Sequence, residues 1–98
     1  MMFESPSTEQ FTIYSKSGCI NCVKVKQLLK SSEQPFNIID CDEYLLETKT
    51  EFLDFIKTIA KVEYKMFPMV FLNGDFIGGY TETNKYLEKN AELFMSDF

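Results

Sequence analysis

Two hydrophobic periodicities alternate along the chain, and together they predict an α/β fold. Segments 11–14, 36–40 and 69–72 are short, apolar and rich in aromatic or β-branched residues, which is typical of strands. Between the first two, residues 19–31 carry apolar side chains at helical spacing, interleaved with lysines. A strand, a helix and a further strand form a βαβ unit, whose strands we expect to be parallel with a right-handed crossover.

The second half of the chain predicts a helix, a hairpin and a last helix. Residues 49–61 repeat apolar side chains at helical spacing. The apolar third strand is followed by Asn73-Gly74, a strong hairpin signal, and by a returning strand at 75–77. A last helix is expected to start near Thr81. The order β-α-β-α-β-β-α predicts a four-stranded mixed sheet flanked by helices.

Length and charge limit what this fold is used for. Ninety-eight residues make one domain, which we place at 11–98 after a polar, disordered lead-in at 1–10. The net charge of −5 argues against binding to nucleic acid. No apolar run is long enough to span a membrane, and the first residues do not look like a secretory signal. We therefore expect a cytoplasmic protein with no membrane partner.

Histidine is absent, and three cysteines are present. Nucleophile pairs that need histidine and histidine-ligated metals are therefore excluded. A zinc ribbon would need a second ligand pair, and only Cys41 remains, so we predict no metal site. Haem attachment would need histidine where Val23 stands. Two incidental core cysteines stay open as an alternative.

Cys19 and Cys22 form a Cys-x-x-Cys motif at the predicted junction between the first strand and the first helix. A thiol at a helix N-terminus is favoured as thiolate by the helix dipole and by free N–H groups. Lys16 adds a nearby positive charge. We therefore predict Cys19 as the nucleophile and Cys22 as the resolving thiol of a redox site.

The chain resembles the dithiol branch of the glutaredoxin family over about residues 11–90. Four segments carry this resemblance: 11–16, 19–22, 66–68 and 78–82. A thioredoxin would usually show a tryptophan before its motif, and this chain has none. The resemblance implies a thioredoxin-like fold and a glutathione-dependent thiol–disulfide oxidoreductase, with glutathione and disulfide-containing or glutathionylated proteins as its partners. It also implies a monomer.

The resemblance also implies a glutathione site. Pro68 would be cis, and the backbone of Phe67 would pair with an extended peptide. Lys16 would bind the glycyl carboxylate, and Lys65 would assist it. Lys24 and Lys26 would complete a local basic patch.

The other end of glutathione, the γ-glutamyl group, would lie at the start of the last helix. There Gly79, Tyr80 and Thr81 would offer backbone groups, and a helix N-terminus suits a carboxylate on independent grounds. Glu82 would bind the glutathione ammonium.

The sequence departs from the family pattern between the cysteines, where Ile20 and Asn21 replace the usual Pro and Tyr. This departure leaves open a dimer that shares a glutathione-ligated 2Fe–2S cluster. A dedicated electron donor to ribonucleotide reductase and a noncatalytic module are further alternatives. Met66-Phe67 replaces the usual Thr-Val, which changes the partners that fit. We predict Cys41 to be a buried or half-buried bystander, with regulatory oxidation as the alternative.

Overall fold

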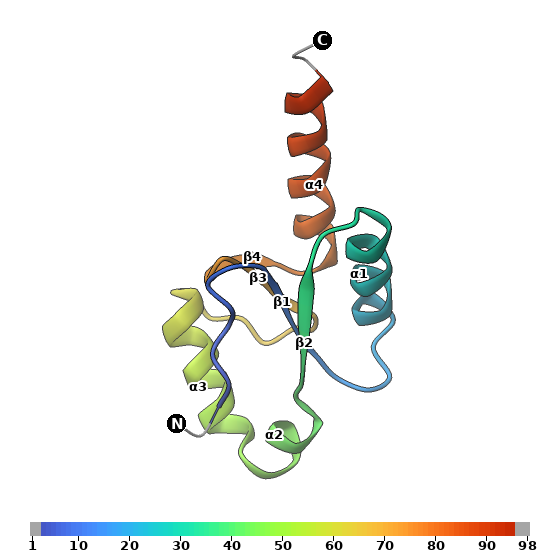
Figure 1. The fold of residues 1–98 in the computed structure, drawn as a ribbon. Helices are drawn as coiled ribbons and strands as arrows, with labels where there is room; N and C mark the ends of the chain where they lie inside the picture. The colour runs from blue at the N-terminus through green and yellow to red at the C-terminus, as the bar shows by residue number, and fades with distance from the viewer. Residues whose placement is uncertain (1–2, 96–98) are drawn as a thin grey trace.

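A computed structural model describes residues 3–95 of the chain (Figure 1). The helices and strands are β1 (Phe11–Ser15), α1 (Ile20–Ser31), β2 (Phe36–Asp40), α2 (Asp42–Glu47), α3 (Lys49–Ala60), β3 (Met69–Leu72), β4 (Asp75–Gly78) and α4 (Tyr80–Met95). The sheet has the strand order β2-β1-β3-β4. β1 and β2 are parallel, and β3 is antiparallel to both β1 and β4. The predicted mixed sheet is therefore confirmed.

The two faces of the sheet bury two separate clusters, because successive side chains of a strand point to opposite faces. The cluster that packs with α1 and α4 is built on Phe11, Ile13, Val25, Leu29 and Val70. The cluster that packs with α3 is largely aromatic and includes Phe3, Tyr14, Cys41, Phe52, Ile56, Met69 and Phe71. In Figure 1, α1 and α3 accordingly lie on opposite sides of the strands.

Most predicted elements are present, with shifted ends and one addition. The first helix begins after Cys19, which is its N-cap residue. β4 extends to Gly78, and α4 begins one residue earlier than predicted. The second predicted helix ends at Ala60, because Lys61 adopts a left-handed conformation with φ 65°. The six-residue α2 was not predicted, because it is too short to show a helical periodicity and none of its residues is fully buried.

The lead-in before β1 differs from the predicted disorder within its described part, residues 3–10. The Phe3 side chain is only 8% exposed and lies 5.0 to 5.5 Å, centroid to centroid, from the rings of Tyr44, Phe52 and Phe55. The Tyr14 hydroxyl donates a hydrogen bond to the Glu4 carbonyl at 2.6 Å. These contacts hold the segment against the core. Residues 1–2 lie outside the described part, as do 96–98.

Within residues 3–95, no helix has the length and apolar character needed to cross a membrane.

Candidate active site

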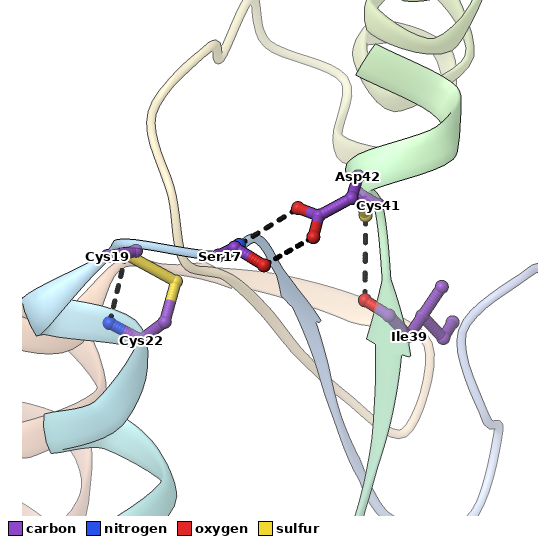
Figure 2. The surroundings of a disulfide bond; sticks show 6 residues. All are labelled: Ser17, Cys19, Cys22, Ile39, Cys41 and Asp42. Carbon is purple, nitrogen blue, oxygen red and sulfur yellow. Dashed lines mark hydrogen bonds between the residues drawn. A yellow bond between two sulfur atoms is a disulfide. The ribbon is translucent and has the colours of Figure 1, made fainter. Parts of the chain in front are cut away.

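The two cysteines of the motif meet at the start of α1, where they form a disulfide (Figure 2). Their Cα atoms lie 5.2 Å apart. Cys19 has an extended backbone and caps the helix: its Sγ accepts a hydrogen bond from the Cys22 backbone N–H at 3.1 Å. A sulfur that accepts a helical N–H is stabilised as thiolate once the disulfide is reduced. The position of the motif is therefore the predicted one.

Exposure distinguishes the two cysteines. Cys19 is half-buried, whereas Cys22 is 1% exposed and belongs to the buried face of α1. Only the sulfur that solvent reaches can meet a bulky disulfide substrate, while the buried one can still attack its neighbour. The geometry therefore favours Cys19 as the nucleophile and Cys22 as the resolving thiol.

The lysine before the motif lies against the segment before β3. The Lys16 Nζ is 5.5 Å from the centroid of the Phe67 ring, a cation–π distance. The Phe67–Pro68 peptide bond is cis, as the resemblance implied. The Phe67 ring in turn stacks on Phe52 with centroids 6.4 Å apart. Three residues expected in the site, from two segments far apart in the sequence, are thus brought together.

The turn into α4 is closed by its own side chains. The Gly79 N–H donates to Glu82 Oε1 at 2.8 Å, so the glutamate folds back over the start of its helix. The Thr83 hydroxyl donates to the Gly79 carbonyl at 2.8 Å. Gly78 has φ 134°, and a Cβ atom built there would lie 2.8 Å from Glu82 Cγ, so this position needs glycine. One carboxylate oxygen of Glu82, the residue expected to bind the glutathione ammonium, is thus already used within the turn.

The other two residues expected in this turn differ in exposure. Tyr80 is half-buried, and the Lys24 Nζ lies 5.8 Å from its ring centroid. Thr81 is exposed. Both belong to the first turn of α4, where backbone N–H groups have no helical partner.

Tyr64 also lies at this turn, and sequence reasoning did not predict it. A Cβ atom built on Gly79 would lie 2.9 Å from the Tyr64 hydroxyl. Burial raises the pKa of Tyr64, and the charge of Glu82 raises it further. Its ring contacts Phe76 edge to face, with centroids 4.9 Å apart. The Tyr64 hydroxyl therefore packs closely against Gly79 and leaves no room for a side chain there.

Lys65 lies apart from these contacts. Its Nζ is 3.9 Å from Glu63 Oε2, and both side chains are largely exposed. The two residues line a hollow together with α3, where Thr50, Leu53, Asp54 and Lys57 form the other wall. A role for Lys65 in the site stays a prediction, as does the wider basic patch with Lys26.

Cys41 is fully buried at the start of α2, within the aromatic cluster. Its Sγ donates to the Ile39 carbonyl at 3.5 Å, and its backbone N–H donates to the Ser15 carbonyl at 2.8 Å. Burial raises the pKa of this thiol to about 12. Its expected burial is therefore confirmed.

Comparison with known proteins agrees with this geometry. The family model described as Glutaredoxin matches residues 11–77, which includes the motif, the cis-proline and the hairpin. The chain belongs to the glutaredoxin family. A curated relative, "Glutaredoxin-2, mitochondrial" of Pongo abelii, is 33% identical over 95 residues, covering 92% of this chain and 53% of the relative. The chain therefore spans about half the length of the curated relatives it matches.

Solved structures support the same fold. Glutaredoxin 1 from Francisella tularensis, crystallised with cacodylate, has a TM-score of 0.72 and 25% identity, covering 84% of this chain and 95% of that one. A buckwheat glutaredoxin in complex with glutathione has a TM-score of 0.69 and 20% identity, covering 86% of this chain and 73% of that one. At this lower identity the likeness concerns the fold alone.

Proposed function

We propose that this chain is a thiol–disulfide oxidoreductase that uses glutathione to reduce protein disulfides and glutathione mixed disulfides. The observation that carries the proposal is the asymmetric pair at the start of α1: a half-exposed Cys19 whose sulfur accepts a helical N–H, bonded to a buried Cys22. The family supports the chemistry, since this motif lies within the matched segment.

The exchange begins with the Cys19 thiolate. It attacks the glutathione sulfur of a mixed disulfide, forms a Cys19–glutathione disulfide and releases the protein thiolate, which takes a proton from water. A second glutathione thiolate then attacks the same sulfur, which yields glutathione disulfide and regenerates the Cys19 thiolate. Alternatively, the Cys22 thiolate attacks the Cys19 sulfur, releases the glutathione thiolate and closes the internal disulfide, which two further glutathiones reduce to the dithiol as they form glutathione disulfide. No histidine base is required, because the helix N-terminus and the Cys22 N–H favour the thiolate form of Cys19.

The glutathione would lie between the contact of Lys16 with Phe67 and the first turn of α4. The Lys16 ammonium is the proposed partner of its glycyl carboxylate, and the Phe67 backbone would pair with the tripeptide. At the other end, the free N–H groups of Tyr80 and Thr81 at the start of α4 would bind the γ-glutamyl carboxylate. The Glu82 carboxylate, through the oxygen that Gly79 does not use, would bind the ammonium.

The test compares reduction of a small glutathione mixed disulfide in a glutathione-coupled assay and in a thioredoxin-reductase-coupled assay. We expect wild-type activity only in the first. Cys19→Ser should lose activity by about a thousandfold or more, because it removes the nucleophile. Cys22→Ser should retain activity on the mixed disulfide, with Cys41→Ser as a matched control. Activity in Cys19→Ser would refute the assignment, and a dead Cys22→Ser would indicate a dithiol route.

The cluster-binding alternative depends on the residues between the cysteines. Ile20 is 73% exposed and Asn21 is also exposed, and neither of these two residues between the cysteines offers an aromatic ring to a bound tripeptide. A bridged 2Fe–2S cluster would be held by the Cys19 thiolate and a glutathione from each of two chains. Visible absorption of anaerobically purified protein, lost when glutathione is removed, together with a dimer in solution, would support this alternative over the monomeric reductase.

Client and compartment stay predictions. The expected cytoplasmic location is untested, and the curated relatives carry "mitochondrial" in their names. A ribonucleotide reductase is one client that the chemistry allows.

A further inference from the structure

The loop that carries Lys16 to Cys19 is short and poorly packed. Its residues 16–18 are exposed, and Gly18 adopts φ 69° with open space around it. Side-chain burial therefore does not fix the loop, although the loop sets where the Lys16 charge and the Cys19 sulfur lie. Apart from the contact of Lys16 with the Phe67 ring, hydrogen bonds must hold the loop in place.

The structure shows two ties between this loop and the start of α2. At the end of β1, the Ser15 carbonyl accepts the Cys41 N–H at 2.8 Å. Two residues further on, the Asp42 carboxylate binds Ser17 twice: Oδ1 accepts the Ser17 backbone N–H at 2.9 Å, and Oδ2 accepts the Ser17 hydroxyl. Figure 2 shows Asp42 reaching across to Ser17, two residues before Cys19. The bond between Ser15 and Cys41 joins two backbone groups, whereas the bonds from Ser17 depend on the Asp42 side chain.

Asp42 is itself held in place for this contact. Its backbone N–H donates to Asp40 Oδ1 at 3.0 Å, which fixes the first turn of α2 directly after β2. The two bonds from Ser17 lower the pKa of the Asp42 carboxyl, and the positive charge of Lys16 lowers it further. The carboxylate is therefore charged at neutral pH.

We infer that Asp42 is a positioning residue for thiol exchange, which fixes the loop through Ser17 and so sets where Lys16 and Cys19 lie. The inference rests on the proposed function, and it assigns a part in that function to α2, a helix outside the cysteine motif and the glutathione segments. Asp42 acts through Ser17 and needs no contact with the substrate.

The experiment separates the hydrogen bonds of Asp42 from its charge. Asp42→Ala removes both, whereas Asp42→Asn keeps an oxygen for the Ser17 N–H and an amide that the hydroxyl can still bond. Ser17→Ala removes only the hydroxyl bond. Glu43→Ala is the matched control, since Glu43 is an exposed acid in the same turn of α2.

Reduction of a small glutathione mixed disulfide is the first readout. We expect kcat/KM to fall about tenfold in Asp42→Ala, mainly through KM, because small displacements of reacting or binding groups are costly. It should fall about threefold in Ser17→Ala and stay within about twofold of wild type in Asp42→Asn and Glu43→Ala. Equal losses in Asp42→Asn and Asp42→Ala would overturn positioning in favour of charge. An unchanged Asp42→Ala would overturn the role altogether. If Asp42→Ala does not fold, Ser17→Ala and Asp42→Asn decide: no loss in Ser17→Ala overturns the inference.

The second readout does not need glutathione. In a Cys22→Ser background, the alkylation rate of Cys19 is measured against pH. Both Asp42→Ala and Asp42→Asn lack the carboxylate charge, but only Asp42→Ala lacks the hydrogen bonds to Ser17. The pH midpoint of Cys19 alkylation should therefore be higher in Asp42→Ala than in Asp42→Asn. Coincident midpoints would overturn the inference, even if the wild-type protein reduced no glutathione mixed disulfide and the proposed function failed.

Discussion

Two neighbouring strand-to-helix junctions of this fold each place a cysteine at the first position before a helix. Cys19 follows β1 and caps α1, and Cys41 follows the parallel strand β2 and precedes α2. Their sulfurs nevertheless do opposite things. The Cys19 sulfur accepts a backbone N–H, whereas the Cys41 sulfur donates to a backbone carbonyl.

The two cysteines occupy equivalent places in the topology, so topology does not account for the difference between their sulfurs. Burial and hydrogen-bond direction do. Cys19 is half-exposed, while Cys41 is 0% exposed among aromatic rings. An N–H that points at sulfur favours the thiolate, and an apolar surrounding favours the thiol. A helix N-terminus is therefore insufficient to activate a cysteine when its sulfur is directed into the core.

The largest expected difference between the two junctions is chemical reactivity. In the reduced native protein at pH 8, iodoacetamide should modify Cys19 at least about a hundred times faster than Cys41, because a thiol with a pKa of about 12 is almost entirely protonated there. Mass spectrometry of peptides over time gives both rates. The same labelling in denaturant is the control and should equalise them. Similar rates in the native protein would show that burial does not suppress the reactivity of Cys41.

The buried junction should also make stability depend on alkaline pH. The folded pKa of Cys41 lies above that of an unfolded cysteine, so the folded state keeps a proton that the unfolded state releases. The stability that the protonated Cys41 thiol contributes to the folded state is fully present below about pH 8.5 and is lost as the pH rises toward about 12. From pH 8 to 9.5, we expect the free energy of unfolding to fall by about 1 kcal/mol through this group.

The measurement is urea unfolding of the oxidised protein, in which Cys19 and Cys22 do not titrate. Cys41→Ala should lose this part of the pH dependence, although it should also be about 1 kcal/mol less stable at pH 7 through lost packing. Parallel pH dependence in the two proteins would show that Cys41 does not cause the effect.

The smallest expected effect concerns the charge beside the exposed junction. Lys16→Gln should slow Cys19 alkylation at pH 7 by about threefold and raise its pH midpoint, because an exposed cation stabilises a nearby thiolate only modestly. Lys30→Gln, in the last turn of α1, changes the net charge equally and should have no effect. The difference should shrink in high salt. An effect of equal size in both variants would point to overall charge.

Local patterns in the sequence were enough to predict the sheet and the motif. The βαβ unit, the Asn73-Gly74 hairpin and the position of Cys19 all depend on neighbouring residues, and all are confirmed. The missed parts depend on distant partners. α2 has only six residues, too few to show a helical periodicity, and its Tyr44 and Leu45 pack on the core only through the fold. Phe3 is one aromatic residue in a polar segment, and only its partners in α2 and α3 account for its burial.

The same reasoning applies to the site. Residues next to the motif or matching the family pattern, such as Lys16 and Pro68, could be named from the sequence. Asp42 and Tyr64 could not, since Asp42 meets Ser17 across 25 residues and Tyr64 meets Gly79 only through the fold. Single-sequence patterns do not encode such pairs.

The burial of Phe3 has a practical consequence for anyone who trims or tags this protein. The family model matches residues 11–77, and an expression boundary drawn there would remove Phe3 together with the whole of α4. The first cut would uncover the rings of Tyr44, Phe52 and Phe55, and the second would uncover the face of α1 that α4 covers. Such a fragment would keep every residue of the Cys-x-x-Cys motif and still present two apolar surfaces to solvent, which favours insoluble product. A purification tag is better placed beyond residue 95 or ahead of residue 3 than at the start of β1.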